Sequence, residues 1–183
     1  MKGVVFNLLE GVVRSRLGDN TWDDLLDAAG VDGAYTSLGN YSDHEMGRLV
    51  QAAAQALGQS ADEVLRWFGR HAMAELAERY PAFFCRHSDT RSFLLTLNDI
   101  IHPEVNKLYP GASTPVFDFD SSGSDVLLMG YQSSRKLCAL AHGFIEGAGD
   151  HYRETVALEH HSCMLRGDAK CLFRMRFSPP AAG

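Results

Sequence analysis

The sequence predicts an α+β fold in which a helical N-terminal part packs on a C-terminal antiparallel sheet with helices. Up to about residue 108, apolar residues recur with the period of amphipathic helices. After Gly111, short runs rich in β-branched and aromatic residues alternate with turn residues, as strands do. Apart from a short C-terminal tail, no linker, repeat or low-complexity segment interrupts the 183 residues. We therefore expect one domain spanning residues 1–183, large enough to bury a core with room for a cofactor.

The first two helices are predicted from an apolar stripe and from cap residues. Residues 2–17 carry apolar side chains at helical spacing. This segment is interrupted by Glu10 and lacks a small-residue cleavage site, so it is not a signal peptide. Thr21 is expected to cap the second helix, which Gly30 closes.

Two capping boxes predict the next two helices. The segments Ser42-Asp43-His44-Glu45 and Ser60-Ala61-Asp62-Glu63 each place a Glu three residues after a Ser. In such a box, the two side chains bond each other's free backbone amides. The first of these helices is expected to end near Gly58 and the second before Pro81.

A further helix is expected from residue 89 or 90 to about residue 108, and it carries His102. Pro103 follows His102 directly. Proline has no amide hydrogen and crowds the carbonyl four residues back, which here belongs to Asp99. We therefore expect this helix to be kinked or to restart at His102.

The rest of the chain reads as strands around one helix, because β-branched and aromatic runs alternate with turn residues. In order we expect a strand at 116–119, a turn at 120–124, a strand at 125–131, a helix at about 135–149, and strands at 152–159 and 170–177.

The composition excludes several function classes. A net charge of −6, a pI of about 5.7 and the lack of a compensating basic stripe argue against nucleic acid as a partner. No apolar run reaches the roughly 18 residues that a membrane span requires. We therefore expect a cytoplasmic protein without membrane insertion, whose cysteines bind metal or react rather than form disulfides.

No catalytic motif stands out in the sequence. There is no Gly-rich phosphate loop, no G-x-S-x-G and no H-E-x-x-H. We therefore predict that the protein is not an enzyme and has no catalytic residues.

Two groups of polar residues carry the functional prediction. His102 lies in the segment H-x-x-V-x-K-L-Y-P, and a neutral imidazole can bind a haem iron. Tyr131, Ser133 and Arg135 form a Y-x-S-x-R run, whose period-2 spacing puts all three side chains on one face of an extended segment. Two hydroxyls and a guanidinium suit a pair of carboxylates. The alternatives are a packed core histidine and a set of polar residues that cap the next helix.

Together these motifs resemble the H-NOX family, the haem-nitric oxide/oxygen binding domains related to the sensor half of soluble guanylate cyclase. The resemblance covers nearly the whole chain. It implies a haem b buried between the helical part and the sheet, with His102 as the iron ligand. It also implies that Tyr131, Ser133 and Arg135 bind the haem propionates.

The resemblance further predicts the haem pocket and the gases that it binds. Relatives that hold oxygen carry a distal tyrosine where this chain has Leu140, and bound O2 profits from such a donor, whereas NO needs none. We therefore expect binding of NO and CO but not O2, with His71 and His142 turned away. Pro115 matches a family proline that distorts the porphyrin, although an ordinary proline at a strand start explains it equally well. The predicted pocket residues are Val5, Leu9, Leu76, Pro115, Leu140 and Phe144.

A second metal site is expected in the C-terminal half. Three cysteines and an imidazole from His160 or His161 make up a Cys3His set, which is common in structural zinc sites. Isolated buried thiols are the alternative. A subset of bacterial H-NOX proteins has the same H-x-x-C…C arrangement, with a cysteine shortly after the Y-x-S-x-R arginine. This match implies zinc bound by Cys138, His160, Cys163 and Cys171.

The implied function is that of a stand-alone bacterial nitric oxide sensor of the zinc-containing subset. NO binding is expected to break the Fe–His102 bond, and the resulting shift is read in trans by a sensor histidine kinase or a diguanylate cyclase/phosphodiesterase. Two other functions stay open. One is a zinc/thiol redox sensor that uses the C-terminal cysteine cluster. The other is a haem enzyme such as a peroxidase, against which the apolar distal pocket argues.

Overall fold

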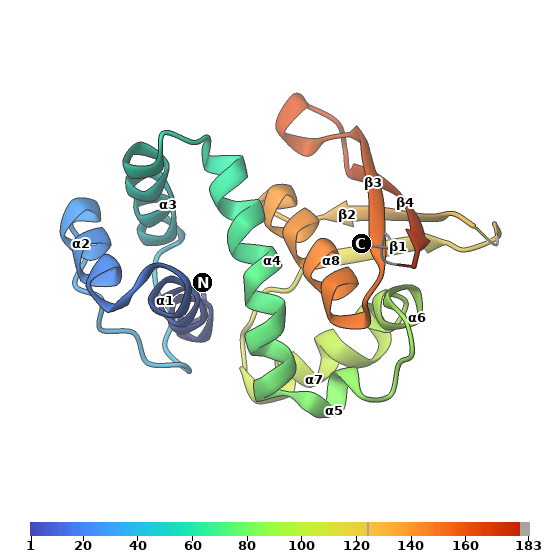
Figure 1. Ribbon diagram of the computed structural model, residues 1–183, viewed down its shortest axis with the longest axis horizontal. Helices are drawn as coiled ribbons and strands as arrows, with labels where there is room; N and C mark the ends of the chain where they lie inside the picture. Colours follow the sequence, from blue (N-terminus) through green and yellow to red (C-terminus); the bar gives the residue numbers. More distant parts are fainter. Residues whose placement is uncertain (124, 180–183) are drawn as a thin grey trace.

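The N-terminal helices form one side of the molecule. A computed structural model describes residues 1–123 and 125–179, so Ser124 of the predicted turn and the tail at 180–183 lie outside the described residues. Three helices pack around a shared apolar core, and a longer fourth helix separates them from the sheet (Figure 1). These helices are α1 (Gly3–Leu17), α2 (Asp19–Ala29), α3 (Asp43–Leu57) and α4 (Ala61–Arg79).

The C-terminal part is an antiparallel sheet with the strand order β1-β2-β4-β3 in the described chain. Helix α8 packs on this sheet and lies beside α4 (Figure 1). The predicted α+β fold, with helices first and an antiparallel sheet after them, is therefore confirmed. The elements are β1 (Val116–Asp120), β2 (Leu127–Gln132), α8 (Cys138–Tyr152), β3 (Thr155–Ser162), a 3₁₀ turn (Met164–Arg166) and β4 (Cys171–Ser178).

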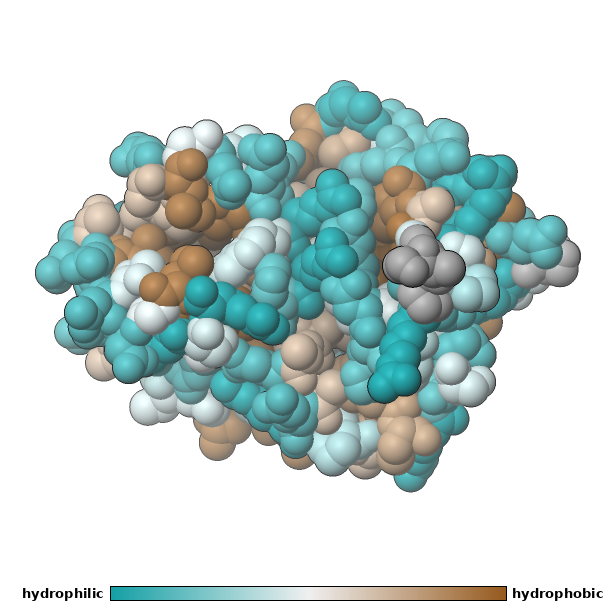
Figure 2. Space-filling model, in the orientation of Figure 1, coloured by the Kyte–Doolittle hydropathy of each residue, from teal (hydrophilic) through white to brown (hydrophobic). Residues whose placement is uncertain are grey.

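Helices α4 and α8 approach each other closely because glycines line their contact. A Cβ atom at Gly143 would lie 2.0 Å from the carbonyl oxygen of Arg66, so no larger residue fits there without a shift. The exposed edge of the contact carries ion pairs, including one between Arg70 Nε and Asp150 Oδ2 at 2.6 Å. Hydrophilic side chains accordingly cover α4 on the face shown in Figure 2. The two helices thus join the N-terminal group to the sheet.

The predicted caps are only partly confirmed. Ser60 and Glu63 form the full capping box of α4. At α3, Ser42 accepts a bond from the amide of His44, but the Glu45 carboxylate accepts a hydrogen bond from the Tyr35 hydroxyl instead of closing the box.

The prediction that Thr21 caps the second helix is wrong. Helix α2 begins at Asp19, because Gly18 adopts a φ of +100° and turns the chain two residues earlier. The Thr21 hydroxyl lies inside the first turn and donates to the carbonyl of Leu17 at 2.8 Å.

The helix predicted from residue 89 or 90 to 108 is broken into three pieces, as the proline suggested. Asp89 caps the first piece through the amide of Ser92. A π-helical turn ends where the last helix restarts at His102, so the predicted restart is confirmed. Together with α5 (Pro81–Phe84), the pieces are α6 (Thr90–Leu94), the π-helix η1 (Leu97–Ile101) and α7 (His102–Leu108).

Helix α8 begins at Cys138, three residues after its predicted start. Lys136 has a φ of +52°, outside the right-handed helical region, so the helix cannot include it. Among the described residues, no helix is both long and apolar enough to cross a membrane.

Candidate functional site

An apolar cavity of about 370 Å³ lies between the N-terminal helices, the α7 segment and the sheet. This volume falls within the usual range for small-molecule and cofactor sites. Apolar side chains make up most of its wall, and the polar side chains on the wall include Tyr131, Ser133 and Arg135. The apolar wall includes Val4, Val5, Leu8, Leu76, Leu97, Ile101, Val105, Leu140 and Phe144.

Five of the six residues predicted to line the pocket do so, and Leu9 does not. Leu9 is 6% exposed and packs in the core that α1 shares with α2 and α3. Leu8 faces the cavity in its place. Helix α1 has apolar side chains on two faces, one toward the core and one toward the cavity. Helical period alone therefore does not show which of Leu8 and Leu9 faces the cavity.

The three residues of the Y-x-S-x-R run lie together on the cavity wall. Tyr131 is buried on β2, and burial raises the pKa of its hydroxyl. Ser133 follows the strand and accepts a bond from the amide of Arg135 at 3.3 Å. The Arg135 guanidinium donates to Asp43 Oδ2 and to the Ser113 carbonyl, each at 2.9 Å. These donors are neighbours on the wall of an apolar cavity, which suits a ligand with carboxylates at one edge.

Asp43 connects Arg135 to the Met1 ammonium, and the sequence analysis did not predict this role of Asp43. Its second oxygen lies 2.8 Å from the Met1 ammonium, which also donates to the Tyr41 carbonyl at 2.6 Å. Burial opposes ionisation of Asp43, but hydrogen bonds from the ammonium and from Arg135 keep the pKa of this carboxyl below its usual value. The ionised carboxylate holds Arg135 beside the cavity.

His102 starts α7 and lies beside the cavity, although its ring is not part of the wall. The residue before it, Ile101, and Val105 one turn later both line the cavity. The His102 ring packs against that of Phe117, with centroids 5.5 Å apart, and it donates to the carbonyl of Pro115. Burial lowers the pKa of His102, so the ring is neutral at pH 7. A neutral ring with one nitrogen bonded to a carbonyl keeps the other nitrogen for a metal.

Two tyrosines on the cavity wall were not predicted. Tyr80 follows α4 and Tyr109 follows α7, and their hydroxyls are hydrogen-bonded to each other. Burial and this bond raise the pKa of Tyr109 to about 12. His71 bonds the Trp67 carbonyl at 2.8 Å, and His142 faces Glu146, so neither ring belongs to the described cavity wall.

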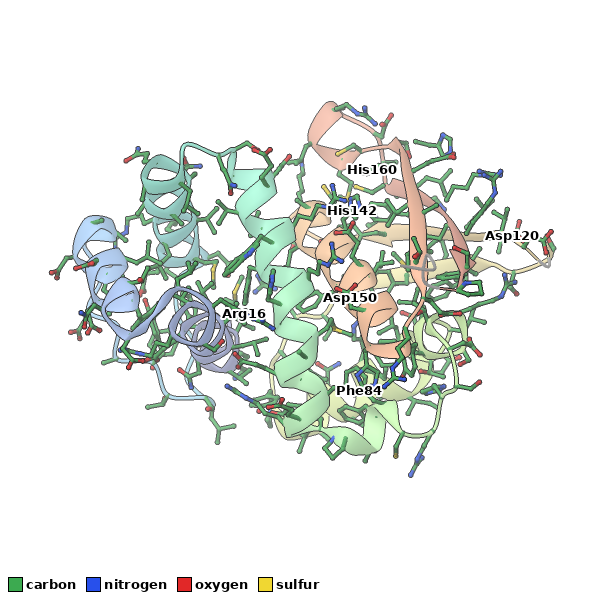
Figure 3. The ribbon with its side chains drawn as sticks, in the orientation of Figure 1. Arg16, Phe84, Asp120, His142, Asp150 and His160 are labelled. Atoms are coloured by element: carbon green, nitrogen blue, oxygen red, sulfur yellow. The ribbon has the colours of Figure 1, made fainter. Side chains whose placement is uncertain are left out.

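The three predicted thiols and His160 come together at the start of α8. Their ligand atoms all lie within 4.8 Å of one another, and the sulfurs of Cys138 and Cys163 are 3.7 Å apart. Sulfur atoms lie beside His160 in Figure 3. His161 is half exposed and pairs with Glu159 instead. The structure thus groups His160, and not His161, with the thiols.

This cluster has the chemistry of a tetrahedral metal site. His160 Nε2 is buried and has no hydrogen-bond partner among the described residues, which costs free energy unless a metal or another ligand binds it. Burial raises the pKa of Cys138 to about 12 and also raises that of Cys171. Burial would raise the pKa of Cys163 as well, but hydrogen bonds, the strongest from the Leu165 amide, bring it below the usual value. Zinc would be held by one imidazole and three thiolates in such a set.

Comparison with known proteins points to one family. The sequence model of the haem-NO-binding family matches residues 2–160. An H-NOX protein from Shewanella oneidensis, solved in the Fe(II)NO ligation state, is 32% identical with a TM-score of 0.90. The alignment covers 97% of this chain and 99% of that one.

Two further solved structures agree with this match. The NMR structure of an H-NOX domain from Shewanella oneidensis in the Fe(II)CO ligation state is 31% identical, with a TM-score of 0.88, and the match covers 97% of this chain and 99% of that chain. An unliganded Fe(II) H-NOX protein from K. algicida, at 24% identity, shares the fold with a TM-score of 0.86 over the whole of both chains.

Proposed function

The chain belongs to the haem-NO-binding (H-NOX) family, and from that premise we propose that it is a haem-based sensor that binds NO and CO but not O2 and signals in trans. Haem-based gas binding and a generally non-catalytic role are properties of the family. The ligand choice, the residue roles and the output are our proposal for this chain.

One observation carries the proposal: the wall of the apolar cavity includes a group of carboxylate-binding donors, and a neutral histidine lies beside the cavity. In this assignment, Arg135 binds a propionate through charge-assisted hydrogen bonds, and Tyr131 and Ser133 add neutral donors. His102 would give one ring nitrogen to the iron, and the Pro115 carbonyl would accept a hydrogen bond from the other. The haem, when bound, would supply the iron that binds the gas.

The cavity wall supports the preference for NO and CO over O2. Leu140, Phe144 and Leu76 offer no hydrogen-bond donor to a bound gas. The hydroxyls of Tyr80 and Tyr109 also reach the wall and bond each other, which uses one of their two O–H hydrogens. A gas that requires a donor gains none from Leu140, Phe144 or Leu76, whereas NO does not require one.

The output is proposed to start from His102. This residue begins α7, and the end of α7 contacts the end of α4 through Tyr109 and Tyr80. A displacement of the His102 ring therefore moves a helix that is bonded to the N-terminal group. A sensor histidine kinase or a diguanylate cyclase/phosphodiesterase would read this change as a partner.

The thiol cluster is assigned as a zinc site that holds the start of α8 to β3 and β4. Cys138 is the first residue of α8, Cys171 is the first of β4, and Cys163 directly follows β3. A second candidate function is redox sensing by these thiols, which the closeness of Cys138 and Cys163 favours. Zinc content and thiol state, measured before and after peroxide, separate a structural from a redox-responsive site.

The absorption spectrum of the purified protein tests the main proposal. We expect a ferrous haem spectrum that changes with NO and with CO and does not change to a stable oxy form in air. His102→Gly should give a native-like ferrous spectrum only when imidazole is added. A wild-type spectrum of His102→Gly without imidazole would assign the axial ligand to another residue.

A further inference from the structure

The side chain of Asn98 bonds the backbone of the first strand in two places. Asn98 Nδ2 donates to the carbonyl oxygen of Phe117 at 2.5 Å, and Asn98 Oδ1 accepts from the Phe117 amide at 3.2 Å. Both bonds are partly buried. Asn98 lies in the π-helical turn η1, and Phe117 lies in β1.

This pair of bonds acts like one more strand pairing. Strand β1 is at an edge of the sheet, and an edge strand presents backbone donors and acceptors without partners. A side-chain amide has one carbonyl and one NH2 group, so it matches a peptide group in both roles. Asn98 therefore completes the hydrogen bonding of Phe117 on the side that faces away from β2.

Asn98 lies four residues, about one helical turn, before His102. The turn between them is wide. Pro103 has no amide hydrogen to donate to the carbonyl of Asp99 and crowds it. The amide of His102 donates to the carbonyl of Leu97, five residues back, as in a π-helix. Because the helix is interrupted at this wide turn, the backbone hydrogen bonds of α7 alone do not fix the position of its first residues. Contacts from outside the helix must then define the position of His102.

Both outside contacts of His102 lead to the segment that Asn98 holds. The His102 ring donates to the Pro115 carbonyl and packs against the Phe117 ring. Asn98 bonds the backbone of that same Phe117. The π-helical turn and the edge strand are thus joined twice, once through Asn98 and once through the His102 ring.

We infer that Asn98 is a positioning residue for His102: it fixes the π-helical turn to β1 and so sets where the imidazole stands. The inference rests on the proposed role of His102 as the axial ligand. Asn98 does not line the cavity, so it would act through His102 and not by touching the haem.

The first test needs no haem. Asn98→Leu keeps the size of the side chain and removes both bonds, and Asn98→Ala also removes the packing. Hydrogen exchange at the Phe117 amide should become on the order of tenfold faster in both variants, since one net hydrogen bond is lost there. Asn106→Leu is the matched control, because Asn106 is an exposed asparagine on α7. An unchanged exchange rate at the Phe117 amide in both Asn98 variants would show that Asn98 does not protect this amide, and the inference would be wrong.

The second test uses the haem-loaded protein and resonance Raman spectroscopy. The iron–histidine stretching band of ferrous Asn98→Leu should shift and broaden relative to wild type, because the imidazole is no longer held in one place. Asn106→Leu should keep the wild-type band. In the His102→Gly background loaded with imidazole, the axial ligand is detached from α7, so adding Asn98→Leu should leave the iron–imidazole band unchanged.

The outcomes separate positioning from general scaffolding. A wild-type band in Asn98→Leu overturns the inference, and so does an equal shift in the imidazole-loaded background. Loss of the native far-UV circular dichroism spectrum in both Asn98 variants also overturns it, because the contact would then support the whole fold. If His102→Gly needs no imidazole, the proposed function fails first, whatever the Asn98 variants show.

Discussion

The thiol cluster and the apolar cavity differ in how far their residues have already come together. In the cluster, the four ligand atoms lie within 4.8 Å of one another and belong to residues at the ends of regular elements. At the cavity, Arg135 is bonded to Asp43 and Ser113, and the His102 ring lies against Phe117 beside the wall. The side chains of the cluster are already arranged as one ion would require. At the cavity, the side chains of Arg135 and His102 are bonded to other protein groups and would have to change partners to bind a ligand.

The supporting elements explain this difference. The cluster joins a helix start and two paired strands, whose positions the antiparallel register fixes. The cavity is bordered by a helix that is broken at a proline and by the loop at residues 111–115. Local opening concentrates in such segments, so the features that make the cavity less organised are consistent with the proposed signal starting there.

Removal of the zinc ligands should produce the largest effect. Wild-type protein purified under reducing conditions should contain about one zinc per chain, and Cys163→Ser should contain none. If free zinc is present at 1,000 times its Kd, the lost stabilisation is about 4 kcal/mol. The melting temperature should then fall by roughly 8–16 °C. Metal analysis and thermal melts measure both effects.

Cys85→Ser is the matched control, because Cys85 is an exposed cysteine outside the cluster. It should keep the zinc and the wild-type melting temperature. Equal zinc in wild type and in a Cys138→Ser/Cys163→Ser variant would mean that the metal binds elsewhere and that the thiol cluster is not a metal site.

Arg135→Ala should have the next largest effect, on haem retention. A charge-assisted hydrogen bond contributes about 1.5–3 kcal/mol and a neutral one about 0.5–1.5 kcal/mol. Haem transfer to an acceptor protein should therefore become roughly tenfold to a hundredfold faster in Arg135→Ala, and at most about tenfold faster in Ser133→Ala.

Arg135→Lys separates charge from geometry, because lysine keeps the charge but lacks the planar fork. It should fall between wild type and Arg135→Ala. Haem transfer from Arg135→Ala at the wild-type rate would exclude Arg135 from propionate binding.

The sequence predicted the features that depend on neighbouring residues. The Ser60 capping box and the restart at His102 follow from residues within one or two turns, and both are present. The prediction that Thr21 caps the second helix was wrong, because Gly18 adopts a positive φ, ends α1 and allows α2 to begin at Asp19. Leu9, which was predicted for the pocket, packs in the N-terminal core and does not line the cavity, because helical period gives the spacing of an apolar face but not which neighbour it meets.

The contacts that sequence reasoning missed join distant residues. Asp43 and Arg135 are 92 residues apart, and Tyr80 and Tyr109 are 29 apart. Asn98 and Phe117 are separated by 19 residues and by the whole of α7. No local pattern marks such pairs. The Y-x-S-x-R residues form a short motif, and the residues of the thiol cluster were predicted because the family resemblance grouped them.

The lack of a donor at Leu140 should have a moderate effect on gas choice. Leu140→Tyr adds a hydroxyl to the wall, and a hydrogen bond to a strongly polar acceptor contributes about 1.5–3 kcal/mol. The O2 affinity should rise about tenfold to a hundredfold, as measured by absorption titration. Leu140→Phe is the control for size and should not show the rise. A stable oxy form of the wild-type protein would show that a donor such as Tyr80 reaches the gas.

The smallest expected effect concerns the tyrosine pair that joins α7 to α4. Tyr109→Phe removes one hydroxyl and leaves that of Tyr80 on an apolar wall without its partner. The cost should be about 1–3 kcal/mol, because an unsatisfied hydroxyl loses its solvation as well as its bond. Tyr80→Phe should cost a similar amount. The double variant leaves no unpaired hydroxyl and should therefore lose less stability than the two single variants added together. Chemical denaturation of the haem-free protein measures all three values. Strict additivity would mean that the two hydroxyls do not depend on each other, and the bond could not then link the His102 helix to the N-terminal group.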